Sequence, residues 1–153
     1  MDVWECDLVD VRVLGKFSDN YKYILCFIDV FSKFPHLVPL KSKTCAAVAS
    51  AFESIFTDPK YSKPRRRPIW LRKDKGKEFL NRQFQDTLKR EGIQFQVYKN
   101  PDFKCSAVER AHRTIKNRIY EYFTYKNVDI STLCQNLSEI TTTRFTVQRA
   151  RQR

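Results

Sequence analysis

The sequence predicts a single α/β domain in which a mixed five-stranded sheet is flanked by helices. Three strand-like segments open the chain, and two more strand-like segments then alternate with helical ones. Consecutive strands are typical of an antiparallel meander, whereas strands separated by helices enter a sheet through crossovers. The chain has 153 residues, of which 42% are hydrophobic. This size and composition suit one domain with a substantial core.

The first three strands are predicted from their apolar patterns. Residues 4–13 alternate apolar with polar side chains, which is typical of a strand with two unlike faces. Residues 21–31 are almost continuously apolar, which predicts a central strand that is buried on both faces. Residues 34–40 contain Pro35 and Pro39, which favour an edge position because proline cannot donate a hydrogen bond to a neighbouring strand.

A helix is predicted over residues 45–56, after Thr44 as its N-cap. Small and aromatic side chains provide its apolar face, namely Ala46, Ala47, Val48, Ala49, Phe52, Ile55 and Phe56. Residues 57–68 contain three prolines and a run of basic residues, so we expect a loop there. A short strand over residues 69–71 follows.

The second half of the chain predicts further helices around one strand. Residues 81–91 read as a helix that ends at Gly92, a residue well suited to terminating helices. Residues 93–98 form the last predicted strand. A long helix is expected over residues 106–125, with an apolar stripe made by Val108, Ala111, Ile115, Ile119, Tyr122 and Phe123. Another helix is expected over residues 130–140.

The charge of the chain indicates a polyanionic partner. Lys and Arg number 29 against 17 Asp and Glu, which gives a formal net charge of +12. Such a basic domain usually binds nucleic acid, and no separate basic amphipathic helix suggests a membrane instead. The five cysteines are odd in number and form no CxxC pair, so a disulfide framework is not expected and a reducing compartment is implied. With only two histidines, a zinc finger is not encoded.

Three acidic residues stand out within this basic chain. Asp7 lies within the first strand, Asp74 follows the short fourth strand, and Glu109 lies in the first turns of the long helix. Mg²⁺ prefers oxygen ligands, and carboxylates that hold two such ions can support phosphodiester chemistry without a protein nucleophile. Taken singly, each residue also fits a structural role: a strand acid beside Asp10, a turn residue, and a carboxylate that complements the helix dipole.

Basic side chains share the helix face of Glu109. His112, Arg113 and Lys116 follow it at spacings of three, four and seven residues. Such a row would position DNA through its phosphates, although a solvated helix face would look the same in sequence.

Four stretches together resemble the catalytic core of retroviral-type integrases, especially those of retrotransposons and of Maverick/Polinton transposons. They are Trp4-Glu-Cys-Asp7-Leu-Val-Asp, Ile28-Asp-Val-Phe-Ser-Lys-Phe34, Asp74-Lys-Gly-Lys-Glu-Phe79, and Asn100-Pro through Val108-Glu-Arg110 to Arg113-Thr114. The resemblance implies a ribonuclease-H-like fold over residues 1–140, followed by a poorly ordered basic tail over residues 141–153. After residue 130 the match fades, and His112 stands where the family usually has Asn.

The resemblance also implies a function and a site. Asp7, Asp74 and Glu109 match the family's catalytic carboxylates, which bind Mg²⁺ or Mn²⁺, and Asp7 is preferred to Asp10 because it follows Trp4 at the family's spacing. The expected activity is DNA 3′-end cleavage and strand transfer, with Lys104, His112, Arg113 and Lys116 contacting DNA. The expected partners are element ends and target DNA, and the expected assembly is a homodimer or higher multimer. The expected location is the nucleus, or the cytoplasm before nuclear entry.

Two other functions remain open from the sequence. The chain could be a catalytically idle, domesticated or truncated module that binds DNA or dimerises. A nuclease acting on RNA–DNA hybrids is compatible with the fold, although the stretch around Glu109 favours the integrase branch.

Overall fold

The computed structural model describes residues 2–13, 19–57, 67–74, 77–98, 106–125 and 134. Several predictions fall outside these residues: most of the expected loop over 57–68, Lys104, and the expected tail over 141–153. The expected helix over 130–140 also lies outside them, apart from Cys134. Within the described part, an α/β fold with a mixed sheet is present, and the predicted fold class is confirmed.

The sheet has five strands in the order β3-β2-β1-β4-β5. They are β1 (Val3–Asp10), β2 (Tyr23–Asp29), β3 (Pro35–Leu40), β4 (Trp70–Lys73) and β5 (Gln94–Val97). Strands β1, β2 and β3 pair antiparallel, as the predicted meander requires. Strands β4 and β5 join parallel beside β1. The proline-containing strand β3 lies at an edge, as expected.

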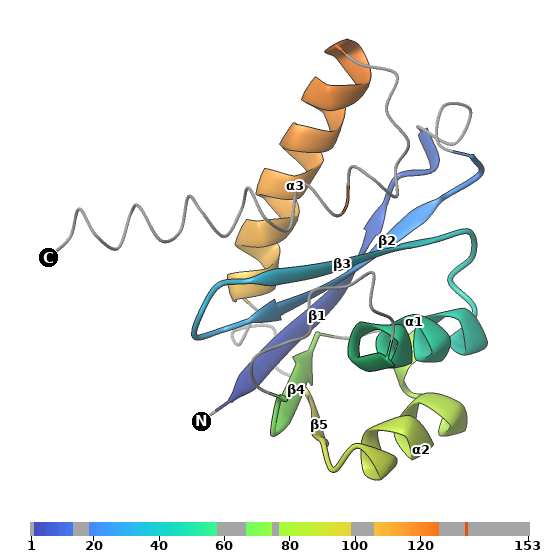
Figure 1. The fold of residues 1–153 in the computed structure, drawn as a ribbon, viewed down its shortest axis with the longest axis vertical. Coiled ribbons are helices and arrows are strands. Elements are labelled where there is room, and N and C mark those ends of the chain that lie inside the picture. Colours follow the sequence, from blue (N-terminus) through green and yellow to red (C-terminus); the bar gives the residue numbers. More distant parts are fainter. Residues whose placement is uncertain are drawn as a thin grey trace, which may run out of the picture.

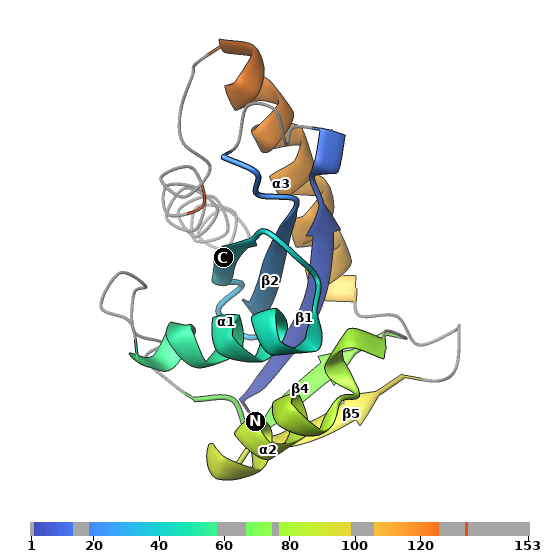
Figure 2. The ribbon, with the colours of Figure 1, turned by 90° about the vertical axis from the view of Figure 1, so that its right-hand side faces the viewer.

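Helices cover both faces of the sheet. Helix α3 (Ser106–Tyr125) packs on one face, while α1 (Cys45–Thr57) and α2 (Arg82–Arg90) cover the other (Figure 1). Figure 2 shows the molecule from the side on which α1 and α2 lie. A short 3-10 helix, η2 (Lys77–Phe79), precedes α2. No helix in the described ranges is long and apolar enough to span a membrane.

Alternating side chains of β1 and β2 supply both cores, and the sequence of β1 differs because Glu5 and Asp7 occupy positions that face α3. On the α3 face, Val9 and Cys26 pack against Ala111 and Ile115. On the opposite face, the side chain of Phe52 lies within 5.0 to 5.4 Å, centroid to centroid, of three other rings, those of Phe27, Phe56 and Phe84. This aromatic cluster joins β2, α1 and α2 and anchors the helices that support the far side of the sheet.

Two helix ends are set by residues that the sequence indicated, Thr44 and Gly92, whereas Asn81 was expected inside the second helix and is instead its N-cap. Thr44 accepts a hydrogen bond from the Ala47 amide at 3.3 Å, and Asn81 accepts one from the Phe84 amide at 2.8 Å. Gly92 adopts a φ of 70° just after α2, a conformation that side chains with a Cβ disfavour. Strand β1 ends at Asp10, three residues earlier than expected, and β4 extends to Lys73, two residues later.

Candidate active site

Asp7 is half-buried on β1, and both of its carboxylate oxygens have polar partners. Oδ1 accepts hydrogen bonds from the Leu8 amide at 2.8 Å and from Nζ of Lys73 at 3.1 Å. Oδ2 lies 3.0 Å from Nδ1 of His112, which reaches across from α3. The Asp7 carboxylate on β1 therefore links this strand to Lys73 of β4 and to His112 of α3, the helix that carries Glu109.

Charge and hydrogen bonding keep Asp7 ionised. Burial alone would raise its pKa, but the hydrogen bond to His112 and the positive charge of Lys73 outweigh burial and lower the pKa to about 2. At neutral pH the side chain is a carboxylate, which is the form that coordinates a metal ion.

Lys73 is the unexpected member of this group. Its side chain is only 4% exposed, and its Nζ lies between Oδ1 of Asp7 and the face of Phe79, whose ring centroid is 4.4 Å away. A buried ammonium needs such partners, because it has lost most of its hydration. Lys73 was not among the site residues predicted from the sequence. The available signal was its spacing of two from the buried residue Leu71, which puts both side chains on the same face of β4.

Asp74 follows β4 directly and is half-buried. The parallel pairing of β1 with β4 sets Val3 opposite Trp70 and Glu5 opposite Arg72. Continuing that register by two residues brings Asp74 opposite Asp7. The two acids therefore belong to adjacent strands at the same end of the β1–β4 pair, where ligand crevices form in α/β sheets.

Glu109 is exposed in the first turn of α3, and a second acid fixes where that turn begins. Oε2 of the buried residue Glu5 accepts hydrogen bonds from the amides of Ala107 and Val108, both at 2.9 Å. Glu5 precedes Asp7 by two residues, so both side chains lie on the α3 face of β1. Glu5 was not predicted as a site residue, although its spacing of two residues from Asp7 is visible in the sequence.

The neighbouring acid Asp10 has a different environment. It is exposed, and Arg12 binds both of its oxygens at 2.7 to 3.0 Å. Asp10 is thus held by a surface ion pair, whereas the side chain of Asp7 contacts Lys73 of β4 and His112 of α3.

The structure gathers only part of the predicted site. It brings Asp7 together with His112, and adds Lys73. In the part of the chain that the structure describes, no three His, Cys, Asp or Glu side chains lie close enough to hold a metal ion. The assignment of Asp7, Asp74 and Glu109 as a metal-binding triad therefore stays a prediction.

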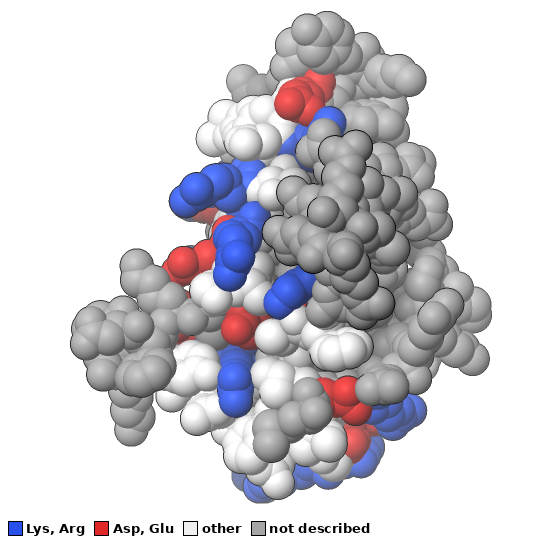
Figure 3. Space-filling model, turned by 90° about the vertical axis from the view of Figure 1, so that its left-hand side faces the viewer, with Lys and Arg blue, Asp and Glu red and all other residues white. Residues whose placement is uncertain are grey.

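Basic side chains mark the outer surface of α3. Arg113 and Lys116 are exposed there, and Lys116 is close enough to help lower the pKa of Asp10, after the larger effect of Arg12. In Figure 3, Lys and Arg side chains form an interrupted column on one side of the molecule, with acidic side chains among them.

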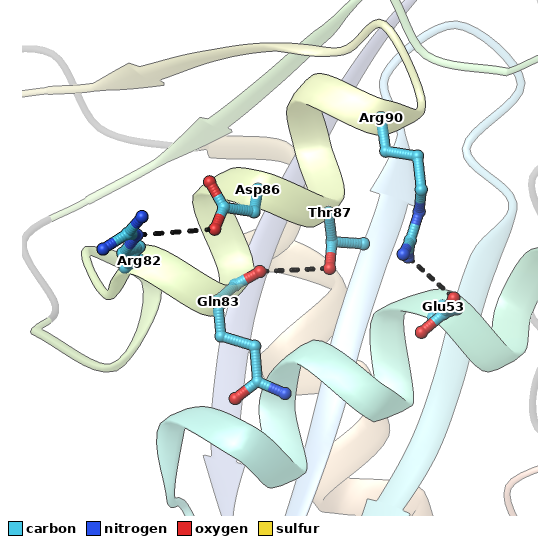
Figure 4. Close-up of a pocket in the computed structure, with 6 residues that line it drawn as sticks. All are labelled: Glu53, Arg82, Gln83, Asp86, Thr87 and Arg90. Atoms are coloured by element: carbon cyan, nitrogen blue, oxygen red, sulfur yellow. Dashed lines mark hydrogen bonds and ion pairs between the residues drawn. The ribbon is translucent and has the colours of Figure 1, made fainter.

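A pocket between α1 and α2 shares no residue with this site (Figure 4). Its charged lining is already paired: Arg90 binds Glu53 at 2.7 Å, and Arg82 lies 3.8 Å from Asp86. The charged residues that line this pocket therefore neutralise one another.

Comparison with known proteins identifies the family. The sequence model of the "Integrase core domain" family matches residues 1–100, so the chain belongs to the integrase core domain family. It is 32% identical over 111 residues to an uncharacterised transposon-derived protein of Caenorhabditis elegans, covering 72% of this chain and 37% of that protein. It is also 32% identical over 118 residues to the Gag-Pol polyprotein of feline leukemia virus, covering 76% of this chain and 6% of the polyprotein.

Solved structures show the same fold. The catalytic core domain of HTLV-2 integrase, in a trimeric complex with magnesium, superposes with a TM-score of 0.63 at 20% identity over 92% of this chain and 81% of that one. The core domain of BIV integrase gives a TM-score of 0.64 at 20% identity over 89% and 79%. The ribonuclease-H-like fold is thus confirmed.

Proposed function

We propose that this chain is the core of an integrase- or transposase-type polynucleotidyl transferase that cleaves DNA 3′ ends and joins them to target DNA. The observation that carries the proposal is the position of Asp7, a carboxylate held ionised beside the strand end that leads to Asp74. Family membership supports the reaction class, and the net charge of +12 supports a nucleic-acid substrate.

The donor set suits Mg²⁺ or Mn²⁺. Asp7, Asp74 and Glu109 offer only carboxylate oxygens, the ligands that hard divalent cations prefer. Bound metal would activate the attacking hydroxyl and stabilise the leaving oxygen. A magnesium complex of a structural relative points the same way.

Residues of α3 would hold the DNA beside these acids. Arg113 and Lys116 are exposed cations on the helix that carries Glu109, and cations so placed bind phosphates and set the register of a strand. His112 and Lys104 are proposed as further DNA contacts. His112 also orients Asp7 through Nδ1.

The assembly and location follow from the same proposal. Structural relatives include a trimeric core and an intasome, so we propose a homodimer or higher multimer that brings element ends and target DNA together. Residues 1–140 would form the catalytic core, with residues 141–153 as a basic tail, and the protein would act in the nucleus.

The test is strand joining on a branched DNA oligonucleotide in Mn²⁺, with the Asp74→Asn and Asp86→Asn variants compared. We expect Asp74→Asn to abolish joining, because it removes one proposed ligand charge. Asp86 is an exposed acid on α2, outside the proposed site, so Asp86→Asn should join like the wild type. Joining that survives Asp74→Asn would refute this site.

An idle DNA-binding module is the second candidate, and the absence of a preformed three-ligand cluster among the described side chains favours it. It predicts that folded wild-type protein binds DNA equally well with and without Mn²⁺ and never joins strands.

A further inference from the structure

The Lys73 ammonium lies within hydrogen-bonding distance of Oδ1 of Asp7, an oxygen of the proposed metal site. Its Nζ is 3.1 Å from Oδ1 of Asp7 and 4.4 Å from the centre of the Phe79 ring. Only 4% of the Lys73 side chain is exposed. If Asp7 is lost as its partner, the ammonium either stays as an unpaired buried charge or moves out of this position.

We propose that Lys73 is an internal counter-ion that competes with the divalent cation for Asp7 and thereby sets how tightly this site binds metal. The inference rests on the proposed function, since it takes Asp7 to be a metal ligand. Lys73 acts through Asp7 and is therefore a positioning residue.

Electrostatics gives the direction of the effect. Two positive charges a few ångströms apart repel each other strongly where solvent is partly excluded. A divalent ion that binds Oδ1 of Asp7 therefore displaces the ammonium from that oxygen. The displacement weakens metal binding relative to a site with a neutral side chain at position 73, and it frees the amine from its contacts with Asp7 and Phe79.

Charge alone does not explain why Lys73 should matter more than other lysines. Lys77 is also near Asp74 in sequence, but it is exposed at the start of η2, where water screens its charge. Lys77 is therefore the matched control: removing it changes the net charge equally without relieving Asp7.

The experiment measures Mn²⁺ affinity by isothermal titration calorimetry on the wild type and four variants. Lys73→Met keeps the length of the side chain without its charge, and should bind Mn²⁺ about tenfold more tightly than the wild type. Lys73→Arg and Lys77→Met should stay within about threefold of the wild type, because each leaves a cation at position 73. Asp7→Asn should lose most of the binding.

A measurement on the wild type makes the test independent of how well Lys73→Met folds. Acetylation of Lys73 by a small amine-reactive reagent, followed by mass spectrometry, should increase several-fold when Mn²⁺ is added. Acetylation of Lys77 should not change.

The outcomes separate the inference from the proposed function. If Asp7→Asn abolishes Mn²⁺ binding while Lys73→Met binds like the wild type, or if Lys73 labelling is unchanged by bound metal, the counter-ion role is refuted and the metal site stands. If neither the wild type nor Lys73→Met binds Mn²⁺, both are refuted.

Discussion

Nδ1 of His112 lies 3.0 Å from Oδ2 of Asp7, so a helix side chain and a strand side chain meet at the proposed active site. Both side chains are partly exposed, which reduces the contribution of this hydrogen bond to the stability of the fold. We expect His112→Ala to lower the free energy of unfolding by about 1 kcal/mol, less than for a fully buried hydrogen bond to a charged group, because water competes for both partners. His112→Asn, which keeps a donor, should lose less. Urea denaturation at pH 7 measures both, and an Ala variant as stable as the wild type would contradict the expectation.

Glu5 fixes the start of α3 through the amides of Ala107 and Val108. Glu5→Ala would leave two buried N–H groups without their acceptor, so we expect a loss of about 2 to 4 kcal/mol in the free energy of unfolding. Glu5→Gln keeps an acceptor oxygen and should lose roughly 1 kcal/mol. Urea denaturation compares them, with the exposed Glu121→Ala as a control that should change little. Equal losses in the Gln and Ala variants would show that the hydrogen bonds are not the cause.

His36 should make stability depend on pH. Burial lowers its pKa from 6.5 to about 4, while nearby Asp29 opposes the shift, and its ring stacks 4.7 Å from that of Trp4. Because the unfolded chain binds a proton first, this group destabilises the fold as pH falls from about 6.5 to about 4, and has no further effect below that. The full effect is about 3 kcal/mol.

The comparison with His36→Phe isolates this contribution from that of the carboxylates. Urea denaturation between pH 4 and pH 8 should show the wild type losing more stability than the variant over that window. Parallel pH profiles for the two proteins would mean that His36 is protonated as easily in the folded state as in the unfolded one.

The exposed cations of α3 should govern how DNA binding responds to salt. Each phosphate contact that is lost reduces the slope of log Kd against log salt by about 0.9 for duplex DNA. Arg113→Gln and Lys116→Gln should each show that reduction in fluorescence anisotropy titrations. Arg82 is an equally basic, 95% exposed residue on α2, and Arg82→Gln should leave the slope unchanged. If the slope falls by the same amount in all three variants, DNA does not bind specifically along α3.

Much of the fold was predictable because its signals are local. The apolar run that became β2 and the stripe of α3 each lie within one element, and Thr44 and Gly92 act on their immediate neighbours. Side chains of Tyr122 and Phe123, which were expected in the stripe, lie outside the described ones. Strand ends were less predictable, because they depend on which partner a strand meets.

The environment of the site was less accessible from sequence. Lysine and glutamate usually lie at the surface, so the spacing of Lys73 from Leu71 and of Glu5 from Asp7 is only a weak local signal for burial. Their burial depends on partners far along the chain: Lys73 meets Asp7 across 66 positions, and Glu5 meets Ala107 across 102. Only the folded structure brings such pairs together.

The strand order also has a consequence for how the protein folds. Strands β1, β2 and β3 pair in succession, whereas β4 reaches β1 only after β2, β3 and α1 have been passed. Pairing between distant segments closes a large loop and is intrinsically slow, so we expect the β1–β4 pairing to follow the meander. Asp7 gains Lys73 only through that pairing. A ribosome-bound chain that has emerged only as far as α1 can therefore hold three paired strands and still lack the contact between Asp7 and Lys73.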